Sequence, residues 1–459
     1  MKTIPKHTFA FLDSWLEFRR GWVNVPGYSI AIAKKGKIVF SKSYGVADKE
    51  SGQKLTPQHI FRVASHSKTF TATAIMQLAE AGKLRIDDHV VDYLDWLKKH
   101  KDSRWKTVTI RQLLSHGAGI IRDGADADYW QLVRPFPETG ELHDAVLESK
   151  LILDPNVKLK YSNYGYGLLG EIIERLSNES YVDYVTRRII KPLGLKRTYP
   201  EFNESIRSQM TSGYSRNNQR NESIRLPQVT TNALAAATGF CSTAEDLCLY
   251  MSAQMVGSGK LLSDESKREM QRMQRIAEPE HEGSYGLGFE LDRYGDRSMF
   301  GHSGGFPGYG SRTMAHTDDE YVVSVMVNCS AGESGSMAKA ITAVIDNFGE
   351  PEPKKSLLKF EGRFADFGSF LEVVVKGNEL VLLWPNWWQV FEETEPLEYV
   401  DKSTLKIVHT NSYYSPGETI KYTFKGNKID HIVNAGSTMY PTVTGEIPEQ
   451  VWKKLTSKN

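Results

Sequence analysis

Residues 65–68 read Ser65-His66-Ser67-Lys68 and lie just ahead of an apolar run, Phe70-Thr71-Ala72-Thr73-Ala74-Ile75-Met76-Gln77-Leu78. If this run is a helix, Ser65 and Lys68 share one face, because residues three apart are neighbours on a helix. The hydroxyl of Ser65 then lies beside an amine and at the positive end of a helix dipole. The stretch therefore predicts an activated serine nucleophile.

The Ser-x-x-Lys pattern alone is weak, because it recurs at Ser103–Lys106, Ser336–Lys339, Ser356–Lys359 and Ser403–Lys406. What distinguishes Ser65 is that two further motifs follow it, Tyr161-Ser162-Asn163 and His302-Ser303-Gly304. A second His-x-Gly occurs at His281-Glu282-Gly283. We prefer His302, because it precedes the glycine-rich stretch Gly305–Gly310, where a substrate backbone could approach a sheet edge closely.

The composition is that of an ordinary globular protein, with 459 residues, 40% of them hydrophobic and 25% charged. The 57 Lys and Arg residues balance the 56 Asp and Glu residues, so no net field favours nucleic acid. No apolar run is long enough to cross a bilayer, and Cys241, Cys248 and Cys329 are too few for a disulfide framework. We expect a cytoplasmic protein with no nucleic-acid partner and no membrane span.

Strand patterns lie near both ends of the segment between residues 28 and 328. Tyr28–Ala33 and Lys37–Tyr44 flank Lys34-Lys35-Gly36 and predict a β-hairpin. Strands are expected again near the other end, at Tyr285–Leu291, Met299–Phe300, Arg312–His316 and Tyr321–Asn328. Strands so far apart in the chain are expected to close one antiparallel sheet.

Helical patterns fill the region between these strands, from Ser65 to about Leu249. Tyr166–Leu176 carries apolar residues at the spacing of one helix face, and Ser242-Thr243-Ala244-Glu245 fits a capping box. Amphipathic helices are also expected over residues 9–18 and from Ser336 to Phe348. The predicted fold class is α/β, an antiparallel sheet flanked by helices with a mainly helical insertion.

The polar, proline-rich segment of residues 350–355 is typical of a linker. Beyond it, short alternating segments are separated by turns such as Lys376-Gly377-Asn378-Glu379, which suggests a small antiparallel β-barrel. We therefore expect a domain over residues 1–349, a linker over 350–355 and a barrel domain over 356–459.

Two further histidines have structural interpretations. On a helix, His66 points away from Ser65 and Lys68, and His116, beside Gly117, is expected to be a loop or packing residue. No histidine–carboxylate cluster has the spacing of zinc ligands. We expect neither a metal nor a cofactor.

The three motifs together resemble those of the serine β-lactamase and penicillin-binding-protein superfamily. The similarity is greatest to the branch with class C β-lactamases, D-aminopeptidases, D-Ala-D-Ala carboxypeptidases and β-lactamase-like esterases. It covers roughly residues 7–348 and includes three further stretches, Leu113–Gly119, Lys191–Leu195 and Gly239–Asp246. The barrel is similar to the lipocalin-like tail of some of these hydrolases, a tail that can narrow the cleft or mediate homo-oligomerisation.

The resemblance implies a role for each motif residue. Ser65 is expected to be the nucleophile, with Lys68 and Tyr161 as the general-base pair; which of the two accepts the proton stays open at this point. Asn163 is expected to bind the lysine and the substrate amide, and His302 and Gly304 are expected to bind substrate. The backbone N–H groups of Ser65 and Gly305 match the oxyanion hole.

His302 departs from the lysine that β-lactamases carry at this position. Histidine is mostly neutral at pH 7, so strong binding of a substrate carboxylate by this residue is not expected. The predicted function is a serine hydrolase that acts through an acyl-enzyme on a small molecule or short peptide, as a D-aminopeptidase-like peptidase or amidase. A carboxylesterase and a non-catalytic penicillin-binding-like scaffold are the alternatives.

Overall fold

The computed structural model describes residues 4–23, 25–219, 222–276, 283–330, 332–348, 351–391, 394–408, 415–446 and 448–457. They form two compact units. One comprises Val25–Gly335, and the other combines Met1–Asn24 with Ser336–Asn459.

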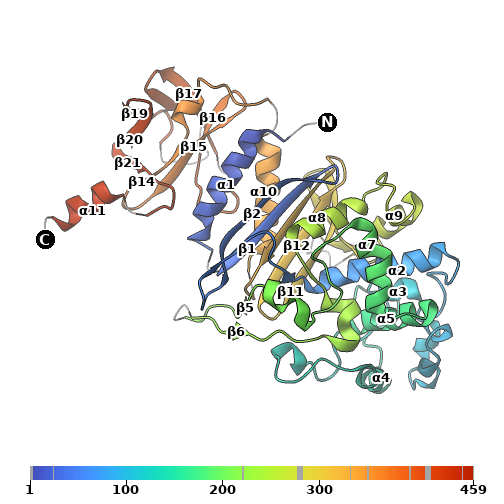
Figure 1. Cartoon of the computed structure of the whole chain (residues 1–459). Coiled ribbons are helices and arrows are strands. Elements are labelled where there is room, and N and C mark those ends of the chain that lie inside the picture. The colour runs from blue at the N-terminus through green and yellow to red at the C-terminus, as the bar shows by residue number, and fades with distance from the viewer. Residues whose placement is uncertain are drawn as a thin grey trace. The chain divides into compact units, whose positions relative to one another are not determined.

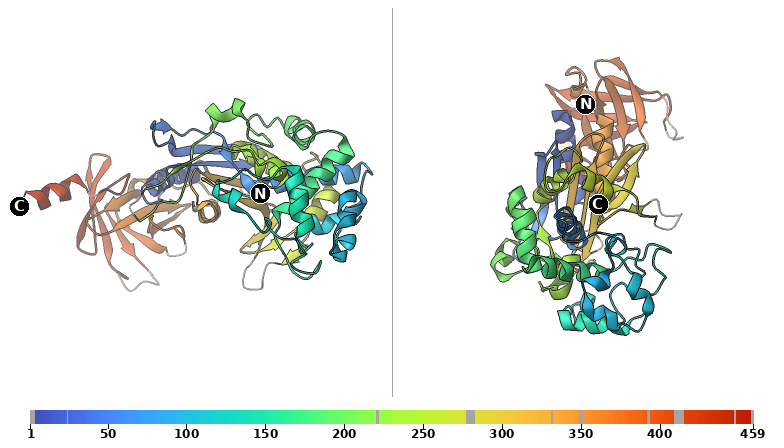
Figure 2. Two further views of the ribbon diagram at one scale, coloured as in Figure 1. Left: turned by 90° about the horizontal axis from the view of Figure 1, so that it is seen from below. Right: turned by 90° about the vertical axis from the view of Figure 1, so that its right-hand side faces the viewer.

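The unit of residues 25–335 is built on one antiparallel sheet. In its described residues the strand order is β3-β2-β1-β13-β12-β11-β10-β9-β8 (Figure 1). The predicted hairpin is present as β1 (Gly27–Lys34) and β2 (Lys37–Asp48). β1 also pairs with β13 (Tyr321–Val327), so the first and last strands of this unit lie side by side, in blue and gold in Figure 2. The predicted closure of distant strands into one sheet is confirmed.

The other strands of the sheet match the expectation only in part. The expected Met299–Phe300 lies within the longer β11 (Arg297–Phe306), and the short strands β3 and β8 have no expected counterpart. The expected strand Tyr285–Leu291 is interrupted, because Gly288 adopts a positive φ of 81° and turns the chain. Strands β9 and β10 result on its two sides. The bounds of the remaining strands in this sheet are β3 Gln53–Lys54, β8 Arg275–Ile276, β9 Ser284–Tyr285, β10 Glu290–Tyr294, β11 Arg297–Phe306 and β12 Tyr309–His316. Two short pairs lie outside it, β4 (Phe61–Arg62) with β7 (Cys241–Ser242) and β5 (Gly213–Tyr214) with β6 (Arg225–Leu226).

The helical insertion is confirmed. Its α-helices are α2 Ser67–Glu80, α3 Ile110–Leu114, α4 Thr139–Glu148, α5 Asn163–Ser177, α6 Tyr181–Val185, α7 Lys191–Leu193, α8 Ala244–Ala253 and α9 Asp264–Gln271. α8 packs against β1, β12 and β13, and α2 packs against α5. The cap of α8 lies one residue later than predicted, since Thr243 Oγ1 accepts from the N–H of Asp246, while the Ser242 hydroxyl bonds Thr198.

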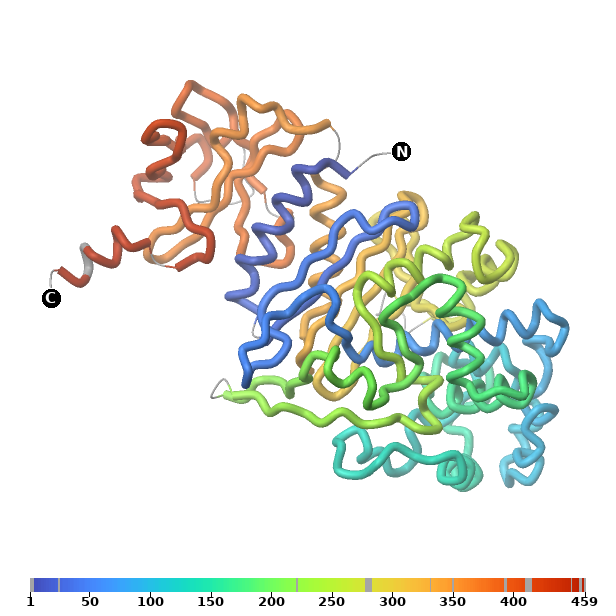
Figure 3. Tube along the Cα trace, in the orientation of Figure 1, coloured from blue at the N-terminus to red at the C-terminus, as the bar shows by residue number. Residues whose placement is uncertain are grey.

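The second unit contains two of the predicted helices, α1 (Lys6–Arg20) and most of α10 (Ser334–Phe348). They lie side by side, as Figure 3 shows in blue and orange, and the ring of Phe11 is 4.7 Å from that of Phe348. This contact joins two segments that lie far apart in the sequence.

The predicted C-terminal barrel is also confirmed. In the described residues its strands close in the order β14 to β21, with bounds Gly362–Ala365, Phe370–Lys376, Glu379–Leu383, Glu395–Asp401, Thr404–Ile407, Thr419–Lys425, Lys428–Asn434 and Ser437–Pro441. Inward side chains such as Val373, Leu405 and Ile420 fill the interior. A last helix, α11, spans Glu449–Thr456.

A buried ion pair connects the barrel to α1. Arg363 Nη2 on β14 lies 2.8 Å from Glu372 Oε2 on β15, and the two side chains are only 2% and 7% exposed. Arg363 Nη1 also donates to the carbonyl of Ser14 in α1, and the guanidinium lies 4.3 Å from the ring centre of Phe18. Removing the arginine would leave the carboxylate of Glu372 buried without a counterion.

We therefore expect Arg363→Met to lower the free energy of unfolding by about 3 to 5 kcal/mol. Urea denaturation measures this loss. The double variant Arg363→Met/Glu372→Leu is expected to recover most of it, because no unpaired charge remains. An unchanged unfolding midpoint in the single variant would contradict the prediction.

Candidate active site

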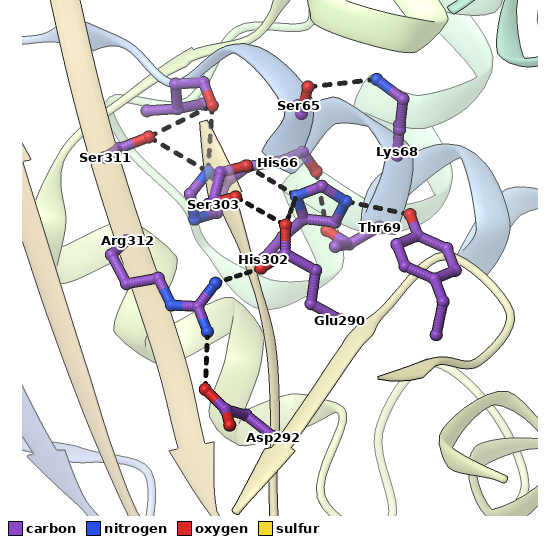
Figure 4. A network of polar contacts seen from close by, with 12 residues as sticks. Ser65, His66, Lys68, Thr69, Glu290, Asp292, His302, Ser303, Ser311 and Arg312 are labelled. Atoms are coloured by element: carbon purple, nitrogen blue, oxygen red, sulfur yellow. Dashed lines mark hydrogen bonds and ion pairs between the residues drawn. The ribbon is translucent and has the colours of Figure 1, made fainter. Parts of the chain in front are cut away.

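Ser65 lies in a 3₁₀ turn, η1 (Ala64–His66), that leads into α2. Ala64 has a positive φ of 48°, a conformation that costs energy for a residue with a side chain, so the backbone just before Ser65 is strained. Lys68 Nζ is 3.1 Å from Ser65 Oγ (Figure 4), which confirms that the two side chains share one face.

Lys68 is completely buried and makes two further contacts. Its Nζ is 2.7 Å from Asn163 Oδ1 and 2.8 Å from the carbonyl oxygen of Ala237. Burial lowers the pKa of this amine well below its usual value, since a charged ammonium would lack solvation. Burial therefore shifts Lys68 toward its neutral form. The carbonyl of Ala237 has no signal in the sequence, because any residue supplies one.

Asn163 is the first residue of α5, but it does not cap the helix. Ser162 does so, accepting a hydrogen bond at its Oγ from the N–H of Gly165 at 3.0 Å. The amide of Asn163 is thus available to Lys68 on one side, and its Nδ2 donates to Asp123 Oδ1 at 2.7 Å on the other. The sequence interpretation missed Asp123, which orients this amide.

Tyr161 completes the group around Lys68. The amine lies 4.7 Å from its ring centre, and the phenol forms a hydrogen bond with Ser65. Burial raises the pKa of Tyr161, and the bond to Ser65 opposes this only in part. His116, expected to be a packing residue, does pack here: its ring centre is 4.1 Å from that of Tyr161, and its Nδ1 accepts from the N–H of Ser162.

The third motif brings β11 against the turn that holds Ser65. A Cβ added at Gly304 would come within 2.2 Å of the carbonyl oxygen of Val63, so only glycine allows this approach. A Cβ at Gly305 would meet no atom within 4 Å, which indicates open space. Pairing with β10 ends at Glu290 opposite Gly301. In the described residues, the β11 edge beyond Gly301 is therefore not paired with β10.

His302 is buried, with both ring nitrogens occupied (Figure 4). Its Nδ1 lies 2.6 Å from the carbonyl of Ser303 and 3.3 Å from Glu290 Oε1, and its Nε2 lies 2.9 Å from the hydroxyl of Tyr285. Because Nδ1 faces two acceptors, it carries the proton, and Nε2 accepts from Tyr285. Burial lowers the pKa of His302 to about 4, so the ring is neutral at pH 7.

Charged residues that the sequence interpretation missed lie behind His302 (Figure 4). Glu290 accepts from Ser303 Oγ and forms an ion pair with Arg312, which also reaches Asp292 at 3.3 Å. Burial would raise the pKa of Glu290, but His302 and Arg312 lower it to about 2. These residues come from neighbouring strands, so their association depends on strand register, which the sequence motifs do not specify.

The first motif also contains His66. His66 is buried, and its Nδ1 lies 2.9 Å from the carbonyl of Val63. Residues 281 and 282 of the alternative His-x-Gly motif lie outside the described residues. Among the residues that the structure does describe, no cluster of histidine, cysteine and carboxylate side chains could hold a metal, and no helix is long and apolar enough for a bilayer.

Comparison with known proteins supports the relationship suggested by these motifs. Protein flp of Staphylococcus aureus (strain MRSA252) is 27% identical over 320 residues, which are 70% of this chain and 63% of that protein. The chain thus spans less than two thirds of the length of this relative. Penicillin-binding protein 4 of Amycolatopsis lactamdurans is 30% identical over 42% of this chain and 49% of its own.

Solved structures show the same fold. The octameric penicillin-binding protein homologue from Pyrococcus abyssi aligns with a TM-score of 0.65 and 25% identity over 94% of this chain and 98% of its own. A D-stereospecific amidohydrolase from Streptomyces sp. aligns with a TM-score of 0.62 and 23% identity over 73% of this chain and 97% of its own, a likeness of fold alone. The family model described as Beta-lactamase matches residues 17–345, so this chain belongs to the beta-lactamase family.

Proposed function

We propose that the protein is a serine hydrolase that forms an acyl-enzyme on Ser65, and that its substrates are amides or short peptides of the kind cleaved by D-aminopeptidases. The contacts of Lys68 Nζ carry this proposal. A neutral amine has two N–H bonds and one lone pair. Asn163 Oδ1 and the Ala237 carbonyl match the two N–H bonds, and the lone pair is then directed to the hydroxyl of Ser65.

This arrangement supports Lys68 rather than Tyr161 as the general base. Burial shifts the two pKa values in opposite directions, lowering that of Lys68 and raising that of Tyr161. At neutral pH the amine can therefore accept a proton while the phenol keeps its own.

The reaction begins when Ser65 Oγ attacks the acyl carbon and its proton passes to Lys68 Nζ. The backbone N–H groups of Ser65 and Gly305 stabilise the oxyanion. As the C–N bond breaks, the leaving nitrogen takes the proton of Tyr161, which is replaced from Lys68. Water then attacks the ester on Ser65 while Lys68 accepts its proton, and Lys68 returns that proton to Ser65 Oγ as the ester bond breaks.

Three features bear on the class of substrate. An extended peptide can pair with the β11 edge beyond Gly301, where pairing with β10 has ended. The open space at Gly305 leaves room for its backbone. The neutral ring of His302 offers no cation at the position where a lysine would bind the carboxylate of a β-lactam.

Intact-mass analysis after treatment with a fluorophosphonate, followed by peptide mapping, tests the nucleophile. We expect one adduct, on Ser65. Hydrolysis is then measured on D-alanine p-nitroanilide, L-alanine p-nitroanilide and p-nitrophenyl butyrate, and we expect cleavage of the D-configured anilide. Activity on the ester alone would contradict the amidase proposal. A folded protein with neither adduct nor turnover would favour the non-catalytic scaffold.

A further inference from the structure

Arg122 lies beside the Ser65 site, although none of the three motifs contains it. Its Cζ is 5.5 Å from the ring centre of Tyr161. Its carbonyl oxygen accepts hydrogen bonds from the N–H groups of Asn163 and Tyr164 at 2.9 and 3.3 Å, so its backbone is fixed at the start of α5. These two backbone hydrogen bonds fix Arg122 against the segment that supplies Asn163.

The guanidinium of Arg122 has more N–H donors than its protein contacts use. Its Nε lies 3.0 Å from Asp123 Oδ2, and this carboxylate is held in turn by Asn163 Nδ2 through its other oxygen. The Arg122 side chain is 64% exposed. Among the described residues, no other ion pair or hydrogen bond is recorded for that side chain, so its two terminal nitrogens have no protein acceptor there. A guanidinium end with two such nitrogens is suited to bind a carboxylate through paired hydrogen bonds.

Three other basic groups described near Ser65 are not available to an anion. Lys68 uses its donors on Asn163 and the Ala237 carbonyl, and its burial opposes the charged form. His302 is neutral and occupied at both nitrogens. Arg312 is paired with two carboxylates on β10. Of these four groups, Arg122 combines exposure with N–H donors that no described protein acceptor uses.

We infer that Arg122 binds a free carboxylate of the substrate and so supplies the anion recognition that His302 lacks. This inference rests on the proposed function. Tyr161 contacts both Ser65 and Arg122, which limits the separation of Ser65 Oγ and Arg122 Cζ to roughly 11 Å. An extended residue spans about 3.3 to 3.6 Å. A carboxylate within three residues of the scissile bond can therefore reach the guanidinium.

Two substrate pairs distinguish the side of the scissile bond on which the carboxylate lies. D-alanyl-D-alanine and its C-terminal amide differ in charge on the leaving-group side. The p-nitroanilides of N-succinyl-D-alanine and N-acetyl-D-alanine differ in charge on the acyl side. For each pair the measured quantity is the ratio of kcat/KM between the anionic and the neutral member. We expect the wild type to prefer the anionic member of one pair.

Arg122→Gln is expected to lower that ratio by about tenfold, and Arg122→Lys by less. The matched control is Arg225→Gln, because Arg225 is similarly exposed (57%) and has one ion pair, with Asp48; it is expected to keep the wild-type ratio. Equal ratios in the wild type and Arg122→Gln for both pairs would overturn the inference while leaving the Ser65 adduct, and the proposed function, intact. A wild type with no adduct and no turnover would overturn both.

Discussion

Ser65→Ala is expected to abolish the fluorophosphonate adduct and to lower kcat by about 10⁴-fold or more, because no other group in the site can form the acyl-enzyme. The hydroxyl of Ser65 contacts Lys68 and Tyr161. Because it is a single small group, its loss removes little packing. Thermal unfolding should therefore stay close to that of the wild type. Intact-mass analysis and hydrolysis of the best substrate measure the two effects.

The chain offers a matched control in its other Ser-x-x-Lys pairs. Ser103 and Lys106 have the same spacing within a 3₁₀ turn, but both are exposed. Ser103→Ala should retain the adduct and full activity. An adduct that persists in Ser65→Ala, or one that is lost in Ser103→Ala, would show that the nucleophile has been wrongly assigned.

The large elements of the fold could be predicted because each has a strong local pattern. The hairpin of β1 and β2 and the helix α5 follow from alternation and from 3.6-residue periodicity. The exact first residue of a helix was harder to predict from the sequence. Thr243 rather than Ser242 caps α8, since two adjacent hydroxyl residues satisfy the same pattern and tertiary contacts decide between them.

In the candidate site, too, local contacts could be predicted and contacts between distant segments could not. The contact between Ser65 and Lys68 is local and followed from helix geometry. The hydrogen bond of Asn163 to Asp123 and that of His302 to Tyr285 depend on how separate loops and strands are brought together. Neither partner belongs to a motif, and the sequence alone could not pair them. Arg122 was missed for the same reason.

Lys68→Met is expected to lower kcat by about 10² to 10⁴-fold, the range typical for loss of a general base. Methionine keeps the volume and the apolar stem of the lysine but accepts no proton. Ser65 would remain in place, so the adduct with a fluorophosphonate should still form, but more slowly. The rate of adduct formation and kcat are the measurements. A variant with wild-type kcat would exclude Lys68 as the base.

The stability of Lys68→Met has a pH dependence that tests the same assignment independently of substrate. In the folded protein the pKa of Lys68 is depressed. In the unfolded chain the same amine has the ordinary lysine pKa of about 10.4. Between those two pKa values the unfolded state binds one more proton than the folded state. Lys68 therefore makes the free energy of unfolding of the wild type rise with pH, by up to about 1.4 kcal/mol per pH unit. Methionine removes this contribution. The variant should therefore be most stabilised relative to the wild type at low pH, and that advantage should shrink as the pH rises toward 10.

Urea denaturation of both proteins at several pH values between 6 and 9 measures this difference. Exposed Lys106→Met is the control and should give a curve parallel to that of the wild type. Parallel curves for Lys68→Met would mean that the amine keeps its proton in the folded protein. It could not then accept the proton of Ser65, and the role of base would pass to Tyr161.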